Sequence, residues 1–323
     1  MTLPDFSRNR FEDARARIAG SVHRTPLLRS RSLSERVGVP LYLKCENLQK
    51  TGAFKVRGAL HRLLRLSEEE RRRGVITISA GNHAQAVAWA AQTAGTSAVV
   101  VMPEHASRTK VEASLGYGAE VILHGDARAA FARAYELAEE RDLCFVHPFD
   151  DEEVVAGHGS CALEILEDLP DVGSIVVPVG GGGLVSGIAA ATAAVRPWVE
   201  VWGVEPEGAD AMYRSLQAGE AVHLDQVDTV ADGLAAPMAG ELNHALVAAH
   251  ARGVVLVRDG DIVDAMKVLL ERTKLLVEPA GAAGLAALLR GRIPLDDAAP
   301  VAVILSGGNV DLDTLVRLLG EER

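Results

Sequence analysis

The sequence predicts an α/β protein with two domains, each built on a mainly parallel sheet flanked by helices. Short runs of β-branched residues alternate with longer amphipathic segments, as strands and helices do in parallel sheets. The predicted strands are apolar at nearly every position, which is typical of strands that are covered on both faces. The length of 323 residues accommodates two domains, because one domain usually takes about 100 to 200 residues.

Eight predicted strands follow one another along the chain. In order, they are LYLK (41–44), VITI (75–78), SAVVVM (97–102), AEVIL (119–123), SIVVPV (174–179), VEVWGVE (199–205), GVVLV (253–257) and VAVILS (301–306). Segments with helical spacing separate them, for example over residues 83–95, 126–141 and 259–276. Polar breaks at SEEERRRG (67–74) and HPFDDEE (147–153) are the best candidates for domain boundaries.

Composition and charge narrow the possible functions. The formal net charge of −11 opposes binding to nucleic acid. No uninterrupted apolar run approaches about 18 residues, and the start of the chain lacks the pattern of a secretory signal, so we expect no membrane association. The three cysteines, Cys45, Cys144 and Cys161, are not closely paired, which is typical of reduced thiols. We therefore expect a cytoplasmic protein.

Four glycines follow the predicted strand at 174–179, in the stretch VPVGGGGLVSG (177–187). Consecutive glycines cost conformational entropy, so we expect them where backbone amides approach a ligand closely or where φ is positive. A phosphate at the N-terminus of the next helix fits this expectation. A dinucleotide fingerprint is the alternative, with Glu205 as the ribose-binding acid, but its last glycine falls on Val185 or Ser186. A purely structural turn is the third interpretation.

Polar residues follow two other predicted strands, in SAGNHAQ (79–85) and SGGN (306–309). In open α/β sheets, ligands bind at the carboxyl ends of the strands, so these residues are candidates for binding. The structural alternatives are helix capping by Ser79 and Asn82, and ordinary turn formation at 306–309.

Lys55 lies between Phe54 and Val56, where a helix is expected to begin, and only six of the 33 basic residues are lysines. A lysine amine attacks an aldehyde only when it is deprotonated, and burial beside apolar neighbours lowers its pKa. Arginine cannot perform this chemistry. The alternative is a surface lysine whose stem lies on apolar neighbours. A reactive lysine together with a phosphate site predicts pyridoxal 5'-phosphate as the cofactor.

Five stretches resemble, in the same order and over nearly the whole chain, the serine/threonine dehydratases and serine racemases, which are fold-type II pyridoxal-phosphate enzymes. They are NLQKTGAFKVRGA, SAGNHAQAVA, VPVGGGGLVSGIA, VEPAGAAG and LSGGNVD. The resemblance implies a small domain over residues 64–148, inserted into a large pyridoxal-phosphate-binding domain of residues 1–63 and 149–323. It also implies a cofactor between the two domains, and a homodimer.

The resemblance implies a role for each site residue. Lys55 is the lysine that binds the cofactor covalently and removes the Cα proton of the substrate. The other residues implied to bind or line the cofactor site are Phe54, Asn82, Gly180, Gly181, Gly182, Gly183, Leu184, Glu278 and Ser306. Those implied to receive the substrate carboxylate are Ser79, Gly81, Asn82 and His83.

The implied activity is that of an L-threonine/L-serine ammonia-lyase, which converts these small amino acids to 2-oxobutanoate or pyruvate and ammonia. Dehydration of another 3-hydroxy amino acid, such as hydroxyaspartate or phenylserine, and serine racemisation are close alternatives. Racemases of this family carry a second serine where this chain has Ala80, which favours dehydration. A nicotinamide-dependent dehydrogenase and a binding protein without turnover are alternatives from other classes.

The family's divalent-cation site would use Glu205 and the carbonyl of Ala209. This chain has Ala211 where a carboxylate is expected, and Asp210 is the candidate substitute. The sequence therefore leaves open whether a divalent cation binds.

Overall fold

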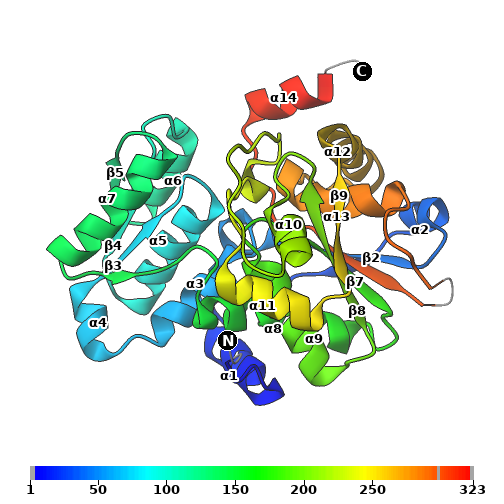
Figure 1. The fold of residues 1–323 in the computed structure, drawn as a ribbon, viewed down its shortest axis with the longest axis horizontal. Helices are drawn as coiled ribbons and strands as arrows, with labels where there is room; N and C mark the ends of the chain where they lie inside the picture. Colours follow the sequence, from blue (N-terminus) through cyan, green and yellow to red (C-terminus); the bar gives the residue numbers. More distant parts are fainter. Residues whose placement is uncertain (1–3, 297–298, 321–323) are drawn as a thin grey trace.

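Two sheets organise the computed structural model, which describes residues 4–296 and 299–320 (Figure 1). The strands are β1 (Leu27–Arg29), β2 (Leu41–Lys44), β3 (Val75–Ile78), β4 (Ala98–Met102), β5 (Glu120–Leu123), β6 (Cys144–Phe145), β7 (Ser174–Pro178), β8 (Glu200–Pro206), β9 (Gly253–Val257) and β10 (Val301–Ile304). The larger sheet has the order β1-β2-β10-β7-β8-β9, and the smaller one has the order β5-β4-β3-β6. All neighbouring strands are parallel except β1 and β2. The predicted α/β fold is therefore confirmed.

Helices cover both sheets. They are α1 (Arg8–Ile18), α2 (Arg31–Val37), α3 (Lys55–Leu64), α4 (Glu68–Arg73), α5 (Asn82–Ala94), α6 (Arg108–Gly116), α7 (Ala127–Glu140), α8 (Glu152–Asp168), α9 (Gly183–Val195), α10 (Ala211–Ala218), α11 (Glu241–His250), α12 (Asp259–Thr273), α13 (Pro279–Leu289) and α14 (Leu312–Gly320). Short 3₁₀ helices are η1 (Glu46–Leu48), η2 (Lys50–Gly52) and η3 (Asp232–Leu234). Within the described ranges, no helix has both the length and the apolar character needed to cross a bilayer.

The predicted elements match the observed ones closely. All eight predicted strands are present, with ends that differ by at most two residues. Strands β1 and β6 were not predicted, because runs of three and two residues are too short to show a periodicity. The helix predicted over 259–276 ends earlier, at Thr273, because Lys274 adopts the left-handed conformation with φ 62°.

The smaller sheet and its helices form a separate group, on the left in Figure 1. Strands β3 to β6 and helices α4 to α7 all fall between residues 68 and 145. The strands of the larger sheet come from both sides of this segment, which is consistent with an inserted small domain. The boundaries at 63/64 and 148/149 themselves stay a prediction.

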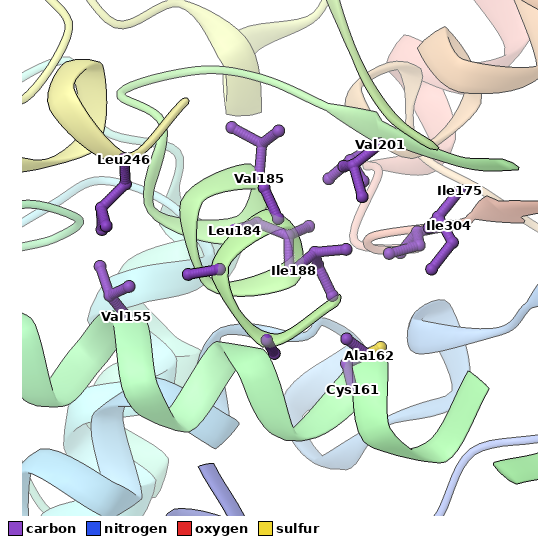
Figure 2. Packing of buried hydrophobic residues seen from close by; sticks show 14 of the residues in the cluster. Val155, Cys161, Ala162, Ile175, Leu184, Val185, Ile188, Val201, Leu246 and Ile304 are labelled. Carbon is purple, nitrogen blue, oxygen red and sulfur yellow. The ribbon is translucent and has the colours of Figure 1, made fainter. Parts of the chain in front are cut away.

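Helix α8 is buried along most of its length and packs against α3 and α9. Gly157 of α8 and Gly187 of α9 permit this close approach, because a Cβ at either position would clash with backbone atoms of the facing helix. Figure 2 shows the apolar side of the contact, where the labelled residues of α8 face those of α9. Helix α3, which begins at Lys55, is therefore held against a rigid support.

Hydrogen bonds among four buried charged side chains connect the start of α3 to the neighbouring elements. The guanidinium of Arg57 donates two hydrogen bonds each to the carboxylates of Glu46 and Glu164, at 2.7 to 2.9 Å. Lys44 Nζ donates to Glu164 at 2.6 Å and to the carbonyl of Thr25 at 2.8 Å. Two cations thus balance two anions, and Arg57 lies only two residues after Lys55. The network ties α3 to α8 and to the segment that follows β2.

Candidate active site

A cavity of about 530 Å³ is lined by segments that follow the carboxyl ends of β3, β7 and β10. Because β3 belongs to the smaller sheet and β7 and β10 to the larger one, the cavity lies between the two sheets. The predicted site residues all line it, namely Phe54, Lys55, Ser79, Gly81, Asn82, His83, Gly180, Gly181, Gly182, Gly183, Leu184, Glu278 and Ser306. The fold therefore brings together residues that are far apart in the sequence.

Lys55 is the first residue of α3 and lies in the cavity wall. Its Nζ donates a hydrogen bond to the carbonyl of Pro148 at 2.8 Å and lies 5.2 Å from the centroid of the Phe54 ring. Burial lowers the pKa of Lys55 to about 8. A larger fraction of this amine is therefore neutral near physiological pH than of an ordinary lysine, as nucleophilic chemistry requires.

The glycine loop, residues 180–184, follows β7, includes the first two residues of α9 and lines the cavity. The carbonyl of Gly181 accepts hydrogen bonds from Asn243 Nδ2 at 2.9 Å and from the amide of Gly240 at 3.1 Å. Among the described residues, none accepts a hydrogen bond from the amides of the four glycines. A helix N-terminus with free amides attracts an anion, so the loop is suited to a phosphate.

Packing also requires glycine in this loop. A Cβ at Gly181 would clash with the ring of Phe149, and one at Gly182 would clash with the side chains of Met212 and Asn243. Gly182 has φ 98°, a conformation that residues with a Cβ rarely adopt. Packing therefore requires glycine at 181 and 182, independently of any role of the free amides.

Asn82, Glu278 and Asn309 form a hydrogen-bonded group across the cavity. Asn82 Nδ2 donates to Glu278 Oε1 at 2.7 Å, and Asn309 Nδ2 donates to Asn82 Oδ1 at 2.9 Å. Burial raises the pKa of Glu278 to about 8, with a smaller contribution from the negative charge of Asp232. The Glu278 carboxyl is therefore largely protonated at neutral pH. The hydrogen bond between Asn82 and Glu278 joins the side of the cavity formed by the smaller sheet to the side formed by the larger sheet.

The loop at 79–83 leads from β3 into α5. Ser79 Oγ accepts a hydrogen bond from the amide of Gly81 at 3.0 Å, which shapes the turn. His83 is buried, and burial keeps its pKa well below the ordinary value, so the ring is neutral. Its Nε2 lies 3.5 Å from the carbonyl of Val146, and no described residue gives its Nδ1 a hydrogen-bond partner. The loop places the N-terminus of α5 at the cavity, and a helix N-terminus is in general a favourable site for an anion.

Ser306 follows β10 and is almost completely buried. Its carbonyl accepts a hydrogen bond from the amide of Phe54 at 3.0 Å, so the residue before Lys55 is attached directly to the end of β10. Ala80 also lines the cavity and contributes a methyl group there.

The cavity is also lined by residues that were not predicted from the sequence, among them Asn309, Phe149, Lys110 and Asp232. Asn309 lies in the SGGN stretch but was not singled out, and Phe149 follows the polar break at 147–153. Lys110 had one usable signal, since lysine is rare in this chain. Asp232 had none, because an aspartate in a loop is ordinary.

Glu205 already has backbone partners. Its two carboxylate oxygens accept hydrogen bonds from the amides of Met212 and Tyr213, at 2.9 and 2.8 Å, at the start of α10. Asp210, the candidate substitute ligand, forms an ion pair with Arg214 at 2.8 Å. Across residues 4–296 and 299–320, no group of three or more His, Cys, Asp or Glu side chains has an arrangement suited to a metal ion.

The cavity fits pyridoxal phosphate. The Lys55 amine matches the aldehyde of this cofactor, and the free amides of the glycine loop match its phosphate. Ser306 supplies a neutral hydroxyl on the wall that carries Lys55. These groups come from β7, β10 and the start of α3, which the fold holds in contact.

Comparisons with known proteins agree with this chemistry. The model of the family "Pyridoxal-phosphate dependent enzyme" matches residues 18–307. An L-threonine ammonia-lyase of Thermotoga maritima is 46% identical over 326 residues, which covers 99% of this chain and 79% of that protein. A catabolic L-threonine dehydratase of Escherichia coli (strain K12) is 40% identical, with coverage of 95% and 94%. The solved structure of maize serine racemase has a TM-score of 0.92 at 40% identity, covering 96% of each chain.

The family match extends over most of the chain and includes Lys55 and the glycine loop. The predicted resemblance and the predicted cofactor are thereby confirmed, and the match decides against a nicotinamide-dependent dehydrogenase. The chain belongs to the pyridoxal-phosphate dependent enzymes.

Proposed function

We propose that the protein is an ammonia-lyase that converts L-threonine and L-serine to 2-oxobutanoate and pyruvate, each with release of ammonia. The observation that carries this proposal is a lysine with a lowered pKa that shares one cavity with the free amides of the glycine loop. Relatives named L-threonine ammonia-lyase and L-threonine dehydratase, at 40% to 46% identity, support the choice of substrate.

The predicted site residues divide the tasks of this reaction among them. Lys55 holds the cofactor and then, as a free amine, removes the proton from the substrate Cα. The glycine loop would hold the phosphate of the cofactor, Asn82 would donate a hydrogen bond to its phenolic oxygen, and Ser306 would supply a neutral hydroxyl to its pyridine nitrogen. When bound, the cofactor withdraws electrons from the substrate Cα, and the neutral hydroxyl of Ser306 keeps this withdrawal mild. The start of α5, with His83, receives the substrate carboxylate.

An assay of the purified, cofactor-loaded enzyme tests the proposal. We expect equal amounts of 2-oxobutanoate and ammonia from L-threonine, and of pyruvate and ammonia from L-serine. A protein that carries the cofactor but releases neither product would disprove the proposed activity, and would favour the binding protein without turnover.

The pH dependence of cofactor attachment follows from the pKa of Lys55. Burial lowers this pKa to about 8, and only the neutral amine attacks the aldehyde. Attachment of pyridoxal phosphate to the apoprotein should therefore accelerate as the pH increases through about 8, and then level off. The absorbance of the lysine-bound cofactor reports the rate. If the attachment rate instead had its pH midpoint at about 10.4, the pKa of an ordinary lysine, the burial of this amine would be contradicted.

Serine racemisation is the second candidate, because maize serine racemase is similar over nearly the whole chain. Racemisation requires a proton donor on the face of the cofactor opposite to the lysine. At position 80, where the family's racemases carry a serine, this cavity presents the methyl group of Ala80, which cannot donate a proton. We therefore favour elimination.

Substitution of Ala80 tests this preference. The unmodified enzyme should convert L-serine to pyruvate with little D-serine, and Ala80→Ser should increase D-serine formation or D-serine dehydration by introducing a hydroxyl. Chiral chromatography of reactions in deuterated water measures both products. Ala80→Val, which is larger but has no hydroxyl, is the control. Abundant D-serine from the unmodified enzyme would mean that another group donates the second proton.

We further propose a small domain over 64–148 within a large domain of 1–63 and 149–323, a homodimer, and a location in the cytoplasm. The restriction of the smaller sheet to one chain segment supports the domain boundaries. The family resemblance supports the dimer, and three free cysteines support a reducing compartment. Analytical ultracentrifugation tests the dimer, and cell fractionation tests the location.

A further inference from the structure

An ion pair joins the two sides of the cavity. Lys110 of α6, on the smaller sheet's side, donates from its Nζ to Asp232 Oδ2 at 2.6 Å. Asp232 begins η3 on the larger sheet's side, and both residues line the cavity wall. The side chain of Lys110 is 24% exposed and that of Asp232 is 63% exposed, which places the pair at the solvent-facing side of the wall.

Both members of the pair are held in place locally. Ser107 caps α6 through a hydrogen bond from the amide of Lys110, which fixes the start of this helix. Asp259, at the start of α12, accepts hydrogen bonds from Thr229 Oγ1 at 2.6 Å and from the amide of Val230 at 2.8 Å. These bonds anchor the chain just before Asp232. The ion pair therefore joins two supported segments.

The positively charged side chains that line the cavity are few, which makes this ion pair important for substrate specificity. Lys55 and Lys110 are the lysines that line the cavity, and no arginine lines it in the part of the chain that the structure describes. Because Lys55 is committed to the cofactor, Lys110 is the permanent cation available to a second carboxylate of a substrate. Asp232 already neutralises it. The field of the pair reaches the interior, since Asp232 raises the pKa of the buried Glu278 and Lys110 lowers it.

We propose that the Lys110–Asp232 ion pair determines specificity, by withholding Lys110 from substrates with a second carboxylate and so favouring neutral 3-hydroxy amino acids. This inference rests on the proposed ammonia-lyase function and narrows its substrate class. It separates threonine and serine from hydroxyaspartate, because the two groups differ in the charge of the β-substituent. The charges of Lys110 and Asp232 cancel, so they have little effect on a neutral substrate. For an acidic substrate, repulsion by Asp232 offsets attraction by Lys110.

The proposal predicts opposite effects for the two members of the pair. Asp232→Asn keeps the shape but leaves Lys110 unpaired, so a second carboxylate should bind more favourably. Lys110→Met leaves Asp232 unpaired, so the same carboxylate should be repelled more strongly. In a partly hydrated site, one unit charge next to the bound ligand changes the affinity for an acidic compound, relative to its neutral analogue, by about tenfold.

The experiment compares two amino acids that have nearly the same shape and differ in charge. Calorimetry on the cofactor-loaded enzyme, at about pH 8 and low salt, gives the dissociation constants of L-aspartate and L-asparagine for the native protein, Asp232→Asn, Lys110→Met and the double variant. The kcat/KM values for L-3-hydroxyaspartate and L-threonine are measured in parallel. Asp142→Asn, which disrupts a surface pair with Arg73 outside the cavity, is the control with the same change of charge.

We expect Asp232→Asn to shift both ratios about tenfold toward the acidic compound, and Lys110→Met to shift them the opposite way. The double variant should return close to the native ratios, and Asp142→Asn should match the native protein. Equal changes for acidic and neutral compounds in Asp232→Asn would overturn the proposal, as would the same shift in the control. Absence of threonine turnover in the native enzyme would instead disprove the proposed function, because the aspartate-to-asparagine ratio does not depend on turnover.

Discussion

Lys55→Ala should abolish turnover and the absorbance band of the lysine-bound cofactor. A methyl group cannot form the covalent bond to the aldehyde, and it cannot remove the Cα proton. Pyridoxal phosphate can still bind noncovalently through the glycine loop. The expected result is therefore a folded protein without measurable ammonia release from L-threonine, with the absorbance spectrum of free rather than attached cofactor. Absorbance spectroscopy, circular dichroism and the ammonia assay report the three properties separately.

Lys50→Arg is the matched control, because Lys50 lies only five residues earlier and is exposed outside the cavity. This variant should keep both the cofactor band and the activity. Near-native turnover in Lys55→Ala would refute the assignment of Lys55. Loss of the absorbance band in Lys50→Arg would indicate that the cofactor is attached to Lys50 instead.

Arg57→Met should destabilise the protein by about 3 to 5 kcal/mol. Arg57 is completely buried and provides hydrogen bonds to both Glu46 and Glu164. Methionine fills part of the space, but it leaves two buried carboxylates with Lys44 as their remaining cation. Urea denaturation measures the change in the free energy of unfolding. Because Arg57 is two residues from Lys55, we also expect weaker attachment of the cofactor.

Arg133→Met is the control for the loss of an arginine with two glutamate partners. Arg133 forms ion pairs with Glu136 and Glu140 on the exposed face of α7, so its removal should change stability only slightly. Similar small effects of both substitutions would show that the buried network does not support α3.

Local sequence determined much of the fold. The eight longer strands were predictable because covered parallel strands are continuous apolar runs, and this property needs no tertiary contact to be visible. Lys55, the glycine run and SAGNHAQ were predictable for a related reason, since each combines unusual residues with a position at an element's end. Strands β1 and β6 were not predictable, because two or three residues carry no periodic signal.

Contacts between distant segments determined the rest. Asn82 and Glu278 are 196 positions apart, and Lys110 and Asp232 are 122 apart, so neither partner is visible in the sequence around the other. The requirement for glycine at position 181 is likewise not visible in the local sequence, because it comes partly from contact with the ring of Phe149. The sequence by itself predicted which groups would carry the chemistry, since reactivity depends on residue type. Only the tertiary structure determined which charges neutralise one another, because the energy of a charge depends on the distance to its partner and on burial.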